Sequence, residues 1–280
     1  MVNFIDDSSN IIGFRDHDKV KHYLEQYYKL LYNYYNINKL KLNNDKNKLV
    51  IINKPRLNNH FKNFTFRAGG EIVKSVSKIK ILGTWIQCDL KLDAEINKLS
   101  SCLHNRINNL NKIKKYTDFK TRLNFMNSFV IGKLNYMLPI YNIAPNYIKN
   151  KLHKILMKAA RGAIGNYCYK KSITHILGQC KWVSINNMIV YSSLIFINKI
   201  IKNKKPKSIL NIYKTQRFLR HKSDISLKNI PKNSKYSKFF IQEHTHTYNT
   251  IPVEIREKSN NTFKREIRVW IKSVLNDTND

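Results

Sequence analysis

Two adjacent carboxylates near the start of the chain are the residues best placed to do chemistry. Asp6 and Asp7 lie between two short apolar runs, residues 2–5 and 11–12. We expect the apolar runs to form two strands and the polar residues between them to form the turn of a hairpin. A hairpin tip presents carboxylate oxygens rigidly without burying them, and Mg²⁺ prefers such ligands. Taken alone, an Asp-Asp pair in a turn is common and usually only solvated.

Phosphoryl transfer by two metal ions needs a further carboxylate from elsewhere in the chain, so the surrounding elements decide what the pair can do. The first 90 residues predict short strands around one helix. The helix runs from a cap at Asp16 or Asp18 to about Tyr35, with apolar residues at three- and four-residue steps. Strands are predicted over residues 49–52, 64–66, 72–73 and 76–85.

From Leu90 onwards the pattern is helical. Apolar residues recur with helical spacing in a series of segments, which predicts helices over residues 93–115, 118–136, 145–165, 173–177, 185–201 and 261–275. Gly132 is a candidate kink in the second of these. Residues 202–206 form a basic linker, and residues 207–247 are polar, basic and weakly periodic. We therefore expect residues 207–280 to be a loosely packed basic appendix with a C-terminal helix.

The charge of the chain points to an anionic partner. Its 280 residues contain 51 Lys and Arg against 18 Asp and Glu, a net charge of +33 spread from end to end. A packed protein with this charge repels itself unless something anionic binds, and nucleic acid is the best candidate. A membrane surface is a poorer one, because no basic amphipathic helix is isolated at a terminus. An AT-rich genome would also raise the lysine content, but it would not hold the acidic residues so low.

The cysteine and histidine spacings favour neither zinc nor secretion. There is no CxxC pair, and the group Cys168, His175 and Cys180 matches no standard zinc module, nor does the pair His244 and His246. Unpaired cysteines are typical of a reducing compartment. We find no signal peptide and no apolar run of the roughly 18 residues that a membrane span needs. We therefore expect a soluble intracellular protein.

Three segments of the first 90 residues resemble the palm domain of reverse transcriptases of LINE-type (non-LTR) retrotransposons. Phe4-Ile5-Asp6-Asp7 is similar to the family's aromatic-x-Asp-Asp motif. Residues 38–46 are similar to the next palm element, Asn-x-Leu-x-Leu-Asn followed by a lysine, which is Lys46 here. Residues 81–86 resemble the Leu-Gly hairpin that is called the primer grip.

Later segments extend the resemblance over nearly the whole chain. Residues 136–141 and 158–161 are similar to parts of the family's thumb and of the helices beyond it. Residues 248–256, with Phe263-Lys264, resemble the common end of such reading frames. Ile251 replaces the usual Leu of that end, and Tyr248 stands where Trp is common.

The resemblance implies an α+β fold in three regions. Residues 1–90 would be a partial palm, a small antiparallel sheet plus a helix; residues 91–201 a helical thumb-like bundle; and residues 202–280 a basic linker with a C-terminal helical region. The implied activity is that of an RNA-directed DNA polymerase, a nucleotidyltransferase, acting on a primer-template of RNA and DNA.

Site residues follow from the same resemblance. Asp6 and Asp7 would hold Mg²⁺ and act in catalysis with Lys46, which would neutralise charge on the incoming triphosphate or protonate pyrophosphate. Leu82, Gly83 and Thr84 would form the primer grip, where a glycine allows close backbone approach. Basic side chains of the helical region would hold nucleic-acid phosphates: Lys112, Lys114, Lys115, Lys120, Arg122, Lys149, Lys151, Lys154, Lys158 and Arg161.

The chain departs from the family before its first motif. In the family, fingers and a palm strand with another catalytic aspartate precede the Asp-Asp hairpin, whereas three residues precede Phe4 here. We therefore expect no polymerase activity from this chain alone, and a separate chain with the fingers and the first half of the palm as a possible partner. The alternatives are a non-catalytic nucleic-acid-binding protein and a truncated, decayed retroelement remnant.

Overall fold

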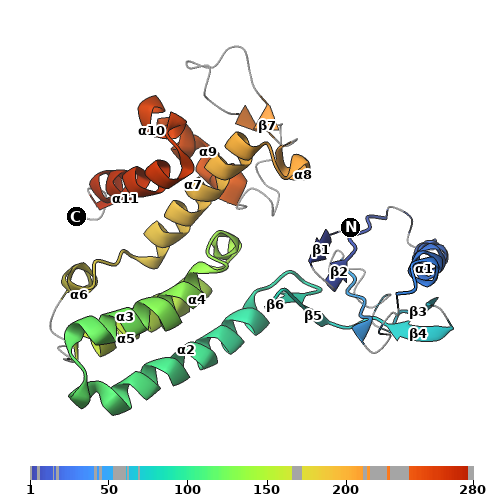
Figure 1. Cartoon of the computed structure of the whole chain (residues 1–280), viewed down its shortest axis with the longest axis horizontal. Coiled ribbons are helices and arrows are strands. Elements are labelled where there is room, and N and C mark those ends of the chain that lie inside the picture. The colour runs from blue at the N-terminus through green and yellow to red at the C-terminus, as the bar shows by residue number, and fades with distance from the viewer. Residues whose placement is uncertain are drawn as a thin grey trace. The chain divides into compact units, whose positions relative to one another are not determined.

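The computed structural model describes residues 2–4, 7–14, 16, 19–40, 43, 46–52, 61, 63–68, 70–165, 172–210, 213–214, 226–227 and 240–276. The chain divides into two compact units, Met1–Asn97 and Lys98–Asp280. Small antiparallel hairpins and many helices make it a mixed α+β protein that is mostly helical, which confirms the predicted fold class at that level (Figure 1).

The strands of the first unit pair as separate hairpins. They are β1 (Val2–Phe4) with β2 (Asp7–Ser9), β3 (Thr65–Ala68) with β4 (Glu71–Lys74), and β5 (Lys78–Ile81) with β6 (Thr84–Gln87). The strand predicted over residues 49–52 is wrong, because Leu49 makes a single parallel bridge to Ser75 and the ladder goes no further. The described strands of this unit thus form two-stranded sheets and no wider one.

Helix α1 (Val20–Ile37) packs on the hairpin β3–β4. Val20 and Leu24 face Phe66, Ala68 and Val73 in one small core. The ring centroids of Tyr28 and Phe66 lie 5.0 Å apart in the same contact. The helix was predicted from its apolar stripe, and it begins at Val20, where Lys19 occupies the cap position without a side-chain cap.

Hairpin β5–β6 is fastened to the start of α2 (Asp93–Ile113). The Glu95 carboxylate accepts from the Trp85 amide at 2.8 Å, and the Gln87 carbonyl oxygen Oε1 accepts from the Ala94 amide at 2.8 Å. Asp93 and Glu95 lie in the first helical turn, where negative charge is favourable. The hairpin is thereby held at a fixed end of a helix.

The second unit begins with helices that pack around α5. In chain order they are the continuation of α2, η3 (Lys114–Tyr116), α3 (Phe119–Met126), η4 (Asn127–Ile131), α4 (Gly132–Asn135), η5 (Ile140–Ile143), α5 (Asn146–Ile164), α6 (Ile173–Gln179) and α7 (Ile185–Asn203). The predicted kink at Gly132 is instead a π-helical turn over η4, and Arg106 donates to the Phe129 carbonyl within it.

Helix α5 is buried on most of its surface. Leu152, Ile155, Leu156 and Ala159 are at most 1% exposed. A Cβ added to Gly162 would lie within 4 Å of side chains from both α2 and α3, so the three helices meet at this point. A helix that packs on several sides has little surface left for a ligand.

The C-terminal region is a second packed core, not the loose appendix that the sequence suggested. It comprises α7 with α9 (Phe240–Thr250), α10 (Val253–Glu257) and α11 (Asn260–Asn276). The short elements α8 (Lys207–Leu210), β7 (Tyr213–Lys214) and β8 (Ser226–Leu227) lie between α7 and α9 in the chain. Composition alone missed this core because its apolar residues are scattered among charged ones.

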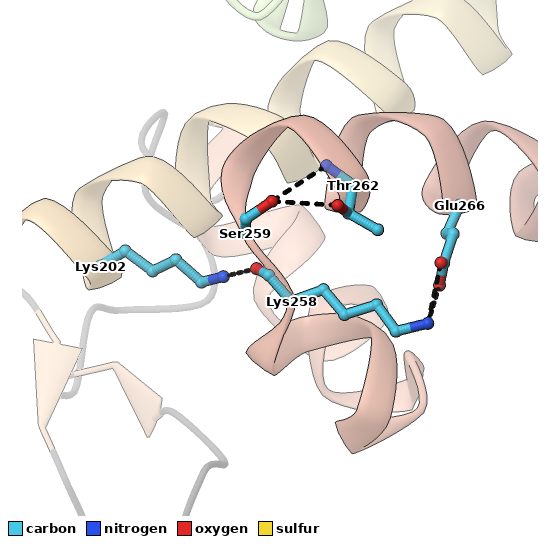
Figure 2. Close-up of polar contacts among 5 residues, drawn as sticks. All are labelled: Lys202, Lys258, Ser259, Thr262 and Glu266. Atoms are coloured by element: carbon cyan, nitrogen blue, oxygen red, sulfur yellow. Dashed lines mark hydrogen bonds and ion pairs between the residues drawn. The ribbon is translucent and has the colours of Figure 1, made fainter.

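The junction of α10 and α11 shows how the sequence ends one helix and begins the next (Figure 2). Ser259 Oγ accepts from the Thr262 amide at 3.4 Å, which caps α11. Lys258 pairs with Glu266 at 2.8 Å, and Lys202 of α7 donates to the Lys258 carbonyl. Across the described part of the chain, no helix is long and apolar enough to cross a bilayer.

Candidate nucleic-acid interface

A hairpin is present at the predicted place, but its second strand comes earlier in the chain than expected. Phe4 pairs with Asp7, Asn3 with Ser8 and Val2 with Ser9. The returning strand is therefore Asp7–Ser9, and the expectation that residues 11–12 form it is wrong; Ile11 is 90% exposed. Asp6 lies outside the described residues, while the backbone of Asp7 begins β2.

The chemistry of Asp6 and Asp7 suits Mg²⁺, and phosphoryl transfer by two metal ions needs a further carboxylate. Hard cations take oxygen donors, and Asp6 and Asp7 supply them. Within the described residues, no three His, Cys, Asp or Glu side chains gather where they could hold a metal ion. Lys46, the predicted partner in catalysis, is exposed, and its amide donates to the Asn43 carbonyl at 3.2 Å.

The Leu-Gly segment forms a tight two-residue turn. Ile81 pairs with Thr84, and the residues between them, Leu82 and Gly83, have φ of +46° and +87°. Positive φ at both positions is the type I′ geometry that matches the twist of a hairpin. Gly83 adopts it freely, whereas a leucine does so at a cost of about 1–2 kcal/mol. The turn nevertheless presents Leu82, 45% exposed, while Thr84 is buried.

Arg122, predicted to hold phosphate, is engaged by the protein's own backbone. Its Nε donates to the Ala163 carbonyl at 2.8 Å and its Nη2 to the Ile164 carbonyl at 3.3 Å, at the end of α5. Its Nη1 donates to the carbonyls of Lys114, at 3.2 Å, and Thr117. The guanidinium thus fastens the connection between α2 and α3, residues 112–120 (the α2–α3 turn), to the C-terminus of α5, where a cation is also favoured by the helix dipole.

The lysines of the α2–α3 turn differ in their exposure. Lys112, Lys115 and Lys120 are exposed, whereas Lys114 is half-buried. Asp118, the acidic residue of this turn, caps α3 by accepting from the Thr121 amide at 3.0 Å, and this hydrogen bonding lowers the pKa of its carboxyl. The turn therefore gathers three solvent-facing cations on a fixed backbone.

The basic residues of α5 do not form one face. Lys149 lines a cavity of about 600 Å³ beside η5 and Glu243 of α9. Lys158 turns to α2, where its Nζ is 3.2 Å from Asn108 Oδ1 and 3.4 Å from His104 Nδ1. Lys154 is exposed, while Lys151 and Arg161 are half-buried. The predicted α5 cluster is thus divided among different surroundings.

The fold lowers the pKa of three histidines of this unit. Burial lowers the pKa of His104, and the nearby charges of Lys158 and Lys151 lower it further. Burial also lowers the pKa of His153 and of His244. His244 Nε2 lies 3.3 Å from Asn142 Oδ1, and Asn142 Nδ2 donates to Glu243 Oε2 at 2.7 Å. His244 therefore belongs to a hydrogen-bonded network between α9 and η5.

Two residues of the group considered for zinc, His175 and Cys180, lie within the described part of the chain. Cys168 lies outside the described residues, and His175 is exposed, 3.2 Å from Gln179. Cys180 is buried, which raises the pKa of its thiol to about 11. A thiol with that pKa is protonated at neutral pH and is a poor ligand or nucleophile.

The motif at the end of the chain is a packing motif. Tyr248, Ile251, Arg256 and Phe263 are all at most 4% exposed. The Tyr248 hydroxyl donates to Asn198 Oδ1 at 2.9 Å, and the Arg256 guanidinium lies 5.8 Å from the centre of its ring. These contacts and the packing of Phe263 against Tyr248 tie α9, α10 and α11 to α7, so the buried residues of the motif serve packing.

Exposed aromatic residues were missed by the sequence analysis. Tyr116 and Phe119 flank the α2–α3 turn and are 87% and 40% exposed. Their signal in the sequence is the interleaving of aromatic residues with Lys112, Lys115 and Lys120.

Comparison of the chain with protein-family models, with curated proteins and with solved structures finds no match.

Proposed function

We propose that this chain is the region of a LINE-type reverse transcriptase that runs from the Asp-Asp palm motif to the C-terminal helices, and that on its own it holds nucleic acid. The order of motifs along the sequence supports the family. The hairpin register that brings Phe4 opposite Asp7, and the tight turn at Leu82 and Gly83, are compatible with it.

In this proposal each group has a distinct task. Asp6 and Asp7 would hold Mg²⁺ together with a carboxylate from another segment or chain, and the metal would stabilise charge on the reacting phosphates. Lys46 would neutralise charge on the triphosphate, and the Leu82–Gly83 turn would contact the primer end. Among these 280 residues we find no third carboxylate with a matching sequence context, so we propose no synthesis by the chain alone.

The observation that carries the binding function is the α2–α3 turn. Lys112, Lys115 and Lys120 are exposed there on a backbone that Arg122 fastens to α5. Phosphate contacts from such side chains supply most of the affinity of non-specific nucleic-acid binding. Because the backbone is already ordered, binding spends little free energy on arranging it.

Fluorescence anisotropy with a labelled RNA–DNA primer-template tests this function. Replacing Lys112, Lys115 and Lys120 together by Ala is expected to weaken binding about tenfold or more at low salt. The matched control replaces three other exposed lysines, Lys199, Lys204 and Lys272, by Ala, which removes the same charge elsewhere. Equal losses of affinity in the two triple variants would show that the lysines of the α2–α3 turn bind nucleic acid no better than other exposed lysines.

A primer-extension assay tests the catalytic part. With Mg²⁺ and all four deoxynucleotides, the isolated chain is expected to add nothing to the primer; incorporation that disappears in Asp6→Ala/Asp7→Ala would overturn this. A non-catalytic nucleic-acid-binding protein is the second candidate, favoured by the exposed lysines. This second function is supported if nucleic-acid binding is unchanged in Asp6→Ala/Asp7→Ala and if adding a chain that carries the fingers does not restore synthesis.

A further inference from the structure

The α2–α3 turn carries exposed aromatic rings among its lysines. Tyr116 is 87% exposed and Phe119 40% exposed, and Ile113 beside them is 48% exposed. Within the described part of the chain, neither ring stacks on another aromatic ring or lies under a cation. Phe119 and Ile113 are partly covered and Tyr116 is almost fully exposed, so all three side chains present apolar surface to the solvent.

The rings are mounted on an ordered backbone. Thr117 Oγ1 donates to the carbonyls of Ile113 and Lys114, both at 3.3 Å. Asp118 caps α3, and Arg122 holds the carbonyls on either side of Tyr116. A side chain with two rotatable bonds on such a backbone loses little entropy when a ligand covers it.

The ligand that suits this surface is anionic and offers flat faces. The exposed lysines Lys112, Lys115 and Lys120 lie within four residues of Tyr116 or Phe119 in the sequence, while the Asp118 carboxylate accepts from the Thr121 amide in the first turn of α3. Unpaired nucleotides supply both properties, because each carries a phosphate and an accessible base face. The bases of a duplex are stacked inside it and offer this surface phosphates alone.

The spacing of the two rings is suitable for neighbouring nucleotides. Thr117 and Asp118, which separate them, have extended backbone conformations. Three residues of extended chain span at most about 11 Å, so both rings are within reach of one short single strand. A membrane surface is less suited, because Tyr116 ends η3 and Phe119 begins α3, so the two rings do not lie on one face of a single amphipathic helix.

We propose that Tyr116 and Phe119 form a stacking platform for unpaired bases, so that the α2–α3 turn binds single-stranded nucleic acid in preference to duplex. This inference rests on the proposed nucleic-acid-binding function and names the form of nucleic acid that this surface takes. The lysines hold the phosphates and the rings hold the bases.

The test replaces both rings by leucine, Tyr116→Leu/Phe119→Leu, which keeps apolar surface but removes the flat faces. Binding of a labelled 20-nucleotide oligothymidine is expected to weaken by about tenfold or more, since base stacking on an aromatic ring is worth roughly five- to hundredfold per base. Binding of a 20-base-pair duplex is expected to change by less than about twofold.

The matched control is Tyr136→Leu, which removes another exposed tyrosine. Tyr136 is 56% exposed, and Lys133 Nζ lies 5.9 Å from the centre of its ring, so one face is already covered. This variant is expected to bind the oligothymidine as the original chain does. A 2-aminopurine base placed in the oligonucleotide is expected to be quenched by the original chain and not by the double leucine variant.

Several results would overturn the proposal. The proposal is wrong if the double leucine variant binds single strands as tightly as the original chain does. It is also wrong if that variant loses affinity for single strand and duplex to the same extent. The surface would be assigned to lipid if the leucine substitutions weaken binding to phosphatidylcholine–phosphatidylserine vesicles but leave single-strand binding unchanged. If the original chain binds neither single strand nor duplex, the proposed function fails as well, which separates the two failures.

Discussion

Arg122 is a predicted interface residue whose guanidinium the fold itself uses. Arg122 and Lys120 are close in sequence and both basic, yet one is bound by four backbone carbonyls and the other is exposed. Arg122→Ala is expected to lower the free energy of unfolding by about 2 kcal/mol, because charge-assisted hydrogen bonds at two helix ends are lost. Urea denaturation followed by circular dichroism measures this.

Lys120→Ala is the control for that measurement. An exposed side chain away from a cap or core usually changes stability by less than about 0.5 kcal/mol. If the two substitutions cost the same, Arg122 does not fasten the turn to α5.

Gly165 is coupled to the same guanidinium. It ends α5 with φ of +82°, and a Cβ there would lie 2.9 Å from Arg122 Nη2. Gly165→Ala is expected to cost more than the 1–2 kcal/mol or so of a left-handed backbone alone, because the held guanidinium must also shift. The cost is expected to be smaller in the Arg122→Ala background, and a double-mutant cycle by urea denaturation measures the difference. Strictly additive costs would contradict the close contact.

At the scale of elements, the C-terminal helices depend on a buried polar contact. The Tyr248 hydroxyl donates to Asn198 between α9 and α7, and burial raises the pKa of this tyrosine to about 12. Tyr248→Phe leaves the Asn198 oxygen buried without this donor, so we expect a loss of about 1–2 kcal/mol. Thermal unfolding measures it, with Tyr23→Phe on the exposed side of α1 as control. A loss no larger than that of the control would mean that the contact is not stabilising.

The histidines between the helices make stability depend on pH. The pKa values of His104, His153 and His244 are all lowered by burial, so the unfolded chain binds these protons more readily than the folded one. The contribution of these histidines to the free energy of unfolding is complete above their ordinary pKa of about 6.5. It is lost as the pH falls below that value and through the lower pKa values of the folded state. Urea midpoints at pH 7.5, 6.5 and 5.5 are expected to fall in that order.

The variant His244→Gln serves as the comparison for the pH series. Glutamine keeps a polar contact to Asn142 and does not titrate, while Glu243 and Lys149 remain beside it. The midpoints of this variant are expected to depend less on pH. An unchanged slope would exclude His244 as a contributor.

At the scale of the whole molecule, the net charge of +33 dominates. If about six phosphates are contacted in a duplex, the logarithm of the binding constant should fall against that of salt concentration with a slope near −5. Affinity would then fall about a thousandfold between 50 and 200 mM salt. Anisotropy titrations across this range measure the slope. A slope near zero would contradict binding through phosphates.

The sequence determined the elements that depend on local pattern. The apolar spacing of α1, α2, α5 and α7 predicted helices close to the observed ones, because one buried stripe at helical period is a local property. The Asp-Asp hairpin was also predictable, although its register was not, since Phe4 opposite Asp7 depends on the length of the turn.

Only the tertiary structure decided which polar residues are available. Nothing local separates Arg122 from Lys120, or Lys158 from Lys154, because burial and hydrogen-bond partners come from helices far away in sequence. The same holds for the motif at residues 248–256, which the fold uses for packing between α7 and α11. Charge and pattern along a chain are local, whereas exposure depends on what the rest of the chain packs against, and exposure leaves the α2–α3 turn as the surface to test.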